Sequence, residues 1–123
     1  MAYQSFEDLE VWKRGCRQAV TLCRALEDSK NYTFKDQMQR AALSVPSNIA
    51  EGHERDSKLD FRRFLRIAKG SNAELRTQIY IALELGFLNK NDTKPILAEC
   101  KEISAMLQGL IRSLDSRKAA AEN

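Results

Sequence analysis

The sequence predicts an all-α protein that folds as one antiparallel, up-down-up-down four-helix bundle. Apolar residues recur at helical spacing in four successive segments, no segment shows the alternation of a strand, and short polar stretches separate the segments. Short connections between long amphipathic helices favour antiparallel neighbours. The chain of 123 residues has the length of one domain. We predict that this domain spans residues 1–116 and that residues 117–123 form a disordered tail, because the tail has nothing to bury.

The first two helices are predicted from their apolar seams. In the first, apolar residues recur at alternating steps of three and four, as in a bundle helix: Leu9, Trp12, Cys16, Ala19, Cys23 and Leu26. Ser5 and Asp8 form a capping box at its start, and the polar stretch 28–33 predicts the first loop. The second helix is expected to begin near Phe34 and to bury five apolar residues: Met38, Ala41, Ala42, Val45 and Ile49.

Pro46 lies inside the second predicted helix. Proline donates no backbone hydrogen bond, and its ring clashes with the preceding turn. We therefore expect either a kink near residues 42–45 or a break into two shorter helices.

The third helix is expected to open at Ser57, with Asp60 completing a capping box, and to run to Leu85. Gly86 can then adopt the left-handed conformation of a C-terminal cap. The apolar face of this helix is formed by Phe61, Phe64, Leu65, Ala68, Leu75, Ile79, Ala82 and Leu83. The fourth helix is expected to begin at residue 91 or 92, with Pro95 in its first turn. Its heptad-like seam consists of Ile96, Cys100, Ile103, Leu107, Leu110 and Leu114.

Composition argues against several classes of protein. The chain is 43% hydrophobic and 30% charged, and it contains no run of about 18 apolar residues, so a membrane span is not expected. Residues 1–10 are acidic and lack the basic and apolar regions of a signal peptide, which predicts a cytoplasmic protein. Cys16, Cys23 and Cys100 are odd in number and lack CxxC spacing, so we interpret them as small core residues.

The sequence carries no pattern typical of an enzyme. His53 is the only histidine, and we expect it at the surface near the end of the second helix. A Ser-His-Asp order, an HExxH pair, a phosphate-binding loop and a dinucleotide glycine pattern are missing, and a di-iron bundle site needs more than one histidine. We therefore predict no enzymatic activity, no cofactor and no metal. One alternative is kept, a metal bound by Cys16, Cys23 and Cys100.

Basic residues gather on the third predicted helix. Residues 57–90 contain seven lysines and arginines against three acids, whereas the remaining segments are nearly balanced. At about 100° per residue, six basic side chains lie within an arc of roughly 80°, clear of the apolar face. This basic stripe consists of Arg55 (if helical), Lys58, Arg62, Arg66, Lys69 and Arg76. Such a stripe can bind phosphates by displacing condensed counterions. The alternative is that these residues solvate the bundle or pair with acids of a neighbouring helix or subunit.

A polar ladder lies beside the apolar face of the second helix. Its members follow at steps of four, four and three: Arg40, Ser44, Asn48 and Glu51. Small residues between them, matched by Gly70, Ser71 and Ala73 in the third helix, allow the two helices to approach closely. We hypothesise that Arg40 and Asn48 pair with Glu51, Glu74 or both across this contact. The alternative is an ordinary solvated face.

These segments resemble a known family. The stretch 36–52, which ends in SVPSNIAEG, the opening FEDLEVW at 6–12 and several positions of the third helix are similar to the four-helix-bundle family encoded in intervening sequences of bacterial 23S ribosomal RNA genes. The similarity spans about residues 6–114. We interpret the positions that match its motif as structural or interface residues: Arg40, Ser44, Pro46, Asn48, Glu51, Gly52, Gly70, Ser71 and Glu74.

The resemblance implies an assembly and a class of partner. Members are similar in forming four-helix protomers that assemble as pentameric barrels. The family includes the accessory variability proteins of diversity-generating retroelements, which partner a reverse transcriptase, and this branch binds nucleic acid with little sequence preference. The net charge of +3 is lower than the basic character of that branch implies.

Two function classes follow from these observations. The first is a non-enzymatic, homo-oligomeric accessory module that binds RNA, DNA or a ribonucleoprotein through the basic stripe. The second is a protein–protein scaffold or assembly module without nucleic-acid binding. Salt dependence separates the two classes, because phosphate binding weakens steeply as the salt concentration rises.

Overall fold

The computed structural model describes residues 5–122, with side chains for residues 5–115. It contains the helices α1 (Glu10–Ala25), α2 (Tyr32–Glu54), α3 (Lys58–Glu84) and α4 (Lys90–Glu122). A single 3₁₀ turn, η1 (Phe6–Asp8), precedes α1, and no strand occurs within residues 5–122. The all-helical class predicted from the sequence is confirmed.

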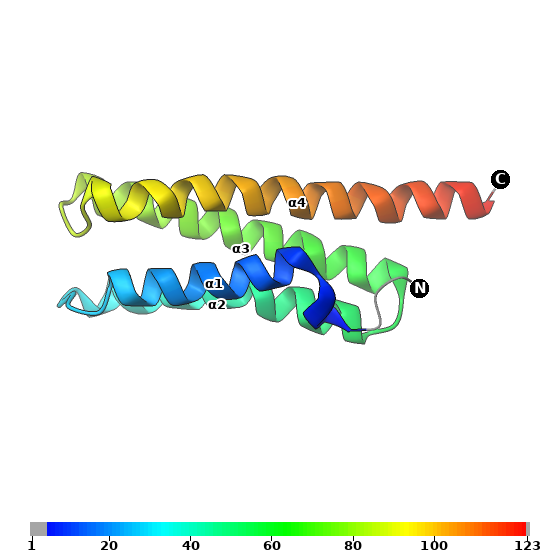
Figure 1. Cartoon of the computed structure of the whole chain (residues 1–123), viewed down its shortest axis with the longest axis horizontal. Coiled ribbons are helices and arrows are strands. Elements are labelled where there is room, and N and C mark those ends of the chain that lie inside the picture. Colours follow the sequence, from blue (N-terminus) through cyan, green and yellow to red (C-terminus); the bar gives the residue numbers. More distant parts are fainter. Residues whose placement is uncertain (1–4, 123) are drawn as a thin grey trace.

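Each helix packs against two others. The backbones of α1 and α2, α2 and α3, α3 and α4, and α4 and α1 approach one another closely, whereas within the described residues those of the diagonally opposite helices do not. In Figure 1, the α1–α2 and α3–α4 connections lie at one end of the molecule and the α2–α3 connection lies at the other. The long axes of the helices run side by side, so the arrangement is a bundle with one shared interior.

The helix ends follow local hydrogen-bonding rules, with one correction. The Ser57 side chain accepts a hydrogen bond from the Asp60 backbone and caps α3 as predicted. Gly86 adopts a φ of 76°, the left-handed cap expected after α3. The Gly86 backbone N–H donates to the Leu83 carbonyl, and the Phe87 backbone N–H donates to the Ala82 carbonyl. These bonds satisfy two carbonyls at the end of α3. The capping box of α1 was wrong, because Ser5 caps the short turn η1.

Two expectations about helix continuity have different outcomes. The helix α2 is continuous through Pro46, so the break into two shorter helices was wrong, and the kink stays a prediction. In α4, the backbone is helical through residues 117–122, where the sequence predicts a disordered tail. The disorder of that tail in solution stays a prediction, and Asn123 lies outside the described residues.

The core faces of α2, α3 and α4 follow their predicted seams closely, whereas the face of α1 does not. In α1 the buried side includes Gly15 and Gln18, while Cys16 and Cys23 are only half-buried. A Cβ added to Gly15 would lie 3.4 Å from the Pro46 ring, an ordinary van der Waals distance, so Gly15 lies where α1 packs beside Pro46 of α2. The α1 seam was therefore assigned to a face turned partly away from the core.

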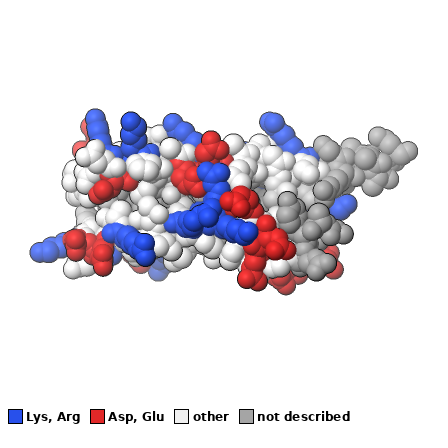
Figure 2. All heavy atoms as spheres, viewed as in Figure 1, with Lys and Arg blue, Asp and Glu red and all other residues white. Residues whose placement is uncertain are grey.

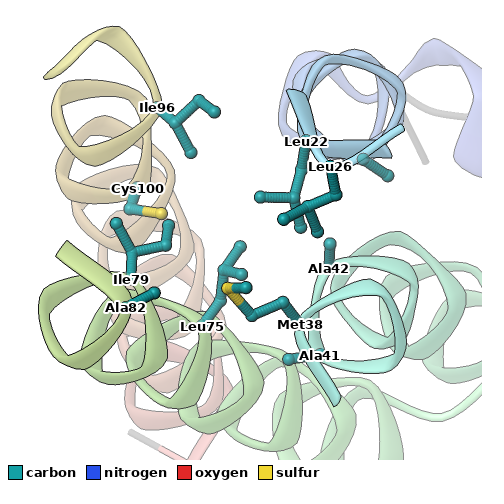
Figure 3. Packing of buried hydrophobic residues seen from close by; sticks show 11 residues of the cluster. Leu22, Leu26, Met38, Ala41, Ala42, Leu75, Ile79, Ala82, Ile96 and Cys100 are labelled. Atoms are coloured by element: carbon teal, nitrogen blue, oxygen red, sulfur yellow. The ribbon is translucent and has the colours of Figure 1, made fainter. Parts of the chain in front are cut away.

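Two apolar clusters fill the bundle along its length. The cluster near the α1–α2 and α3–α4 connections draws on all four helices, and Figure 3 shows its side chains converging in the space between them. A second cluster, which includes Ile49, Leu65 and Leu107, fills the other end. Near Cys100, two buried amides hydrogen-bond to α4: Gln18 donates to the Ile96 carbonyl at 2.7 Å, and Asn72 donates to the Cys100 carbonyl at 2.7 Å. These bonds tie α1 and α3 to the same stretch of α4.

Candidate nucleic-acid interface

The predicted basic stripe divides into paired and free residues. Arg62 is mostly buried and forms an ion pair with Asp115 of α4. Lys69 donates a hydrogen bond of 2.6 Å to the Gln108 side chain, also on α4. These contacts show that the stripe borders α4. Lys58 and Arg66 are exposed, and neither forms an ion pair with a described residue.

Arg55 lies apart from the rest of the stripe. It is the C-terminal cap of α2 and not a residue of α3, so its inclusion in a helical stripe was wrong. Its guanidinium lies 3.5 Å from Glu51 and stacks over the Phe64 ring at 5.1 Å from the ring centre. Arg63 stacks on the same ring at 4.8 Å, so this corner of the surface packs α2 against α3.

Arg76 remains on the stripe and is half-buried beside the core. Burial raises the pKa of the Cys100 thiol, and the hydrogen bond from Gln18 and the charge of Arg76 act in the opposite direction. The Arg76 Nε atom is buried and has no hydrogen-bond partner among the described residues.

The fourth helix supplies basic residues that the sequence analysis missed. Lys90, Lys94 and Lys101 of α4 are exposed and line one pocket together with Tyr80 of α3. Helical geometry places exposed Arg112 on the same side of α4 as these lysines. In Figure 2, basic side chains project along the upper edge of the view, where α4 lies, while the front face mixes both charges.

Within residues 90–115 of α4, the acidic side chains lie on other sides of the helix or form ion pairs. Glu99 forms a salt bridge with Arg14 of α1, with a distance of 2.8 Å between Arg14 Nε and Glu99 Oε2. Asp115 is paired with Arg62. The charges of residues 91–123 sum to zero, so a charge count does not show that the basic residues lie on one side of the helix. The signal available in the sequence was the spacing 90, 94, 101 and 112, which puts all four cations on one side of a helix.

We name this surface the α3–α4 basic face. It combines the free or singly hydrogen-bonded cations of α3 with those of α4 and is bordered by the Arg62–Asp115 pair. Glu84 is exposed at its edge near the α3–α4 connection. Its members are Lys58, Arg66, Lys69, Arg76, Lys90, Lys94, Lys101 and Arg112.

The polar ladder of α2 forms a different network from the one hypothesised. Ser44 Oγ lies 2.8 Å from Ser71 Oγ, which is the contact between the two helices. Asn48 donates to both the carbonyl and the hydroxyl of Ser44 at 2.8 Å. The proposed pairing of Asn48 with a glutamate was wrong, because a short amide reaches its own helix more readily than the opposite one.

The charged members of the motif also find other partners. Arg40 lies 3.3 Å from Asp36 with 81% of its side chain exposed. Glu51 pairs with Arg55, and Glu74 accepts a hydrogen bond from Gln78 one turn away. Pairing of Arg40 with Glu51 or Glu74 within one chain was therefore wrong.

The motif glycines have unequal surroundings. Gly52 is buried, and a Cβ added there would lie 2.4 Å from the Cβ of Phe64. Gly70 is exposed, and a Cβ there would meet nothing within 4 Å. Close packing of α2 on α3 accounts for Ser44, Gly52 and Ser71, whereas Arg40, Gly70 and Glu74 lie on the outside of the same helix pair.

Cysteines and histidine provide no metal centre within the described residues. Cys100 is buried in the core as expected. Cys16 and Cys23 are half-buried and border a groove with Val20 and Leu43, so their assignment to the core was wrong. Burial raises the pKa of Cys16.

His53 is more enclosed than expected. It is half-buried and meets Phe61 edge-on, with 5.5 Å between the ring centres. Both ring nitrogens are buried and have no hydrogen-bond partner among the described residues. Its predicted surface position was therefore wrong.

The sequence of this chain matches a known protein family. A model of the family described as 23S rRNA-intervening sequence protein matches residues 7–109. The chain belongs to this family. No curated protein matches the chain. Within residues 5–122, no helix is both long enough and apolar enough to cross a membrane.

A solved structure agrees with the fold of this family member. The crystal structure of a protein with unknown function from the S23 ribosomal protein family of Bacteroides thetaiotaomicron superimposes with a TM-score of 0.77. The two chains are 21% identical, and the match covers 82% of this chain and 97% of the other. At this identity the likeness concerns the fold alone.

Proposed function

We propose that this protein is a non-enzymatic, homo-oligomeric accessory module that binds RNA through the phosphates contacted by its α3–α4 basic face. The observation that carries the proposal is the gathering of cations from two helices on one side of the bundle. Such an array neutralises phosphates and releases their counterions without reading bases. The family description, which refers to 23S rRNA intervening sequences, favours RNA over other polyanions.

Salt dependence tests the RNA-binding proposal. Affinity for a structured ribosomal RNA fragment is measured by fluorescence anisotropy at several salt concentrations. For about three phosphate contacts, we expect affinity to fall on the order of 40-fold between about 50 and 200 mM salt. Replacing Arg66, Lys94 and Lys101 together by glutamine should reduce the slope of log affinity against log salt by about 0.9 per lost contact. Arg62 is left unchanged because it pairs with Asp115.

A matched variant controls for net charge. Lys13, Arg24 and Lys30 are exposed and lie outside α3 and α4, so their replacement by glutamine removes the same charge from another surface. This variant should keep the wild-type slope. Equal slopes for wild type and both variants would refute the role of the α3–α4 basic face.

A protein–protein scaffold is the second candidate function. It is supported by the motif residues that packing within one chain leaves unexplained, Arg40, Gly70 and Glu74. We propose that this outer side of α2 and α3 contacts another copy of the chain, in a pentamer as the family resemblance implies. A cytoplasmic location and, in the retroelement branch, a reverse transcriptase partner are proposed together with the RNA-binding accessory module.

Light scattering tests the assembly. We expect a mass near five times the 14.0 kDa of one chain. Arg40→Glu should reduce this mass, because it reverses a charge at the proposed contact, and Asp36, with which Arg40 pairs, is largely exposed. Lys13 is an exposed residue of α1, so Lys13→Glu is the control and should leave the mass unchanged. A monomeric wild-type protein would contradict the assembly, and an unaltered mass for Arg40→Glu would place the contact elsewhere.

A further inference from the structure

A pocket lies between α3 and α4 within the α3–α4 basic face. Its volume is about 410 Å³. Tyr80 and Leu83 line it from α3, and Leu97 lines it from α4. Both leucines are half-buried, so their side chains contribute apolar surface to the pocket. The pocket therefore combines an aromatic ring with an apolar lining.

The aromatic ring of Tyr80 is available to a ligand. Tyr80 is 46% exposed and belongs to none of the aromatic pairs among the described residues. A tyrosine in this situation offers a flat π-face on which another planar group can stack. Nucleobases are the planar groups that stack on exposed aromatic side chains of proteins that bind single strands.

Three lysines complete the pocket. Lys90, Lys94 and Lys101 line it from α4, and none of them forms an ion pair with a described residue. At about 1.5 Å per residue, they are spread over roughly 16 Å along the helix. Cations spaced over this length suit a chain of phosphates better than a single small anion.

We propose that this pocket binds an unpaired base of an RNA strand, with the base stacked on Tyr80 and the adjoining phosphates contacted by the three lysines. The proposal rests on the RNA-binding function proposed above and adds a preference for single-stranded segments. A duplex keeps its bases stacked inside the helix, so it can engage the lysines but cannot place a base on Tyr80.

Two RNA probes test this preference. One is a single strand of about 12 nucleotides, and the other is a duplex of the same length, each titrated into the wild-type protein at low salt. We expect tighter binding of the single strand. Tyr80→Ala should reduce affinity for the single strand about tenfold and leave duplex binding nearly unchanged. Tyr80→Phe keeps the ring and should bind the single strand within about twofold of wild type.

Tyr32→Ala is the matched control, because Tyr32 is 71% exposed and lies at the start of α2, outside α3 and α4. Its affinity for both probes should equal that of wild type. Circular dichroism verifies that each variant is folded. Lys94→Gln should lower the affinity for both the single strand and the duplex, because both probes carry phosphates.

The outcomes separate this inference from the broader proposal. The base-binding pocket is overturned if Tyr80→Ala binds the single strand as tightly as the wild-type protein does. It is also overturned if the wild-type protein binds the single strand and the duplex equally well. Both results leave phosphate binding intact. Failure of the wild-type protein to bind either RNA at low salt overturns the RNA-binding function itself. A fall in affinity with Tyr80→Ala but not with Tyr80→Phe supports stacking.

Discussion

Asn72→Asp is expected to lower the free energy of unfolding by about 1–3 kcal/mol at neutral pH, because it replaces a buried hydrogen-bond donor with a charged acceptor and half-buried Arg76, one turn away, offsets only part of the cost. Asn72 is 1% exposed, and its amide nitrogen donates to the Cys100 carbonyl at 2.7 Å. A carboxylate has no proton to donate, so it would face that carbonyl as a second acceptor. The buried polar contact would change from attraction to repulsion.

The loss should depend on pH in a defined direction. Burial raises the pKa of a carboxyl group, so the folded variant holds its proton more tightly than the unfolded chain does. Stability therefore falls as the pH rises from the unfolded pKa through the folded pKa, and the penalty shrinks as the pH is lowered. Urea unfolding followed by circular dichroism at several pH values measures this dependence.

Asn91→Asp is the control for this prediction. Asn91 is exposed in the first turn of α4, where the same change in chemistry leaves the charge in water near a helix N-terminus. Its effect on stability should remain within about 0.5 kcal/mol. If Asn72→Asp proved as stable as the wild type at neutral pH, the buried position of the amide would be refuted.

Gly52→Ala is expected to destabilise the protein by about 1–3 kcal/mol through overpacking. The added Cβ would lie 2.4 Å from the Phe64 Cβ, an atom attached directly to the α3 backbone. Turning the Phe64 ring would leave this contact in place, because rotation about χ1 does not move the Cβ atom. Relief therefore requires α2 and α3 to move apart.

A second glycine separates packing from helix propensity. Gly109 lies inside α4, and a Cβ there would meet nothing within 4 Å. Gly109→Ala should stabilise the protein by about 0.5–1 kcal/mol, because alanine loses less backbone entropy on folding than glycine. Urea unfolding should thus separate the two variants by about 1.5–4 kcal/mol. Similar stabilities would contradict the close approach of α2 to α3 at Gly52.

Part of the candidate interface could be predicted from the sequence and part could not. The stripe on α3 was visible because its cations repeat at helical spacing within one segment. The pairing of Arg62 with Asp115 depends on which side of α4 faces α3, which no local pattern records. The pocket around Tyr80 likewise needs residues from two helices that meet only in the folded bundle.

The sequence by itself determined the all-helical class, the family and the buried faces of α2, α3 and α4. In a long amphipathic helix, the spacing of the apolar residues shows both the helical period and the side that is buried. The tertiary structure decided the face of α1. Gly15 and Gln18 interrupt an apolar pattern, yet both are buried, since Gly15 packs beside the Pro46 ring and the Ile96 carbonyl accepts a hydrogen bond from Gln18. Burial of a small or polar residue depends on what the neighbouring helix offers, and only the packed bundle supplies that neighbour.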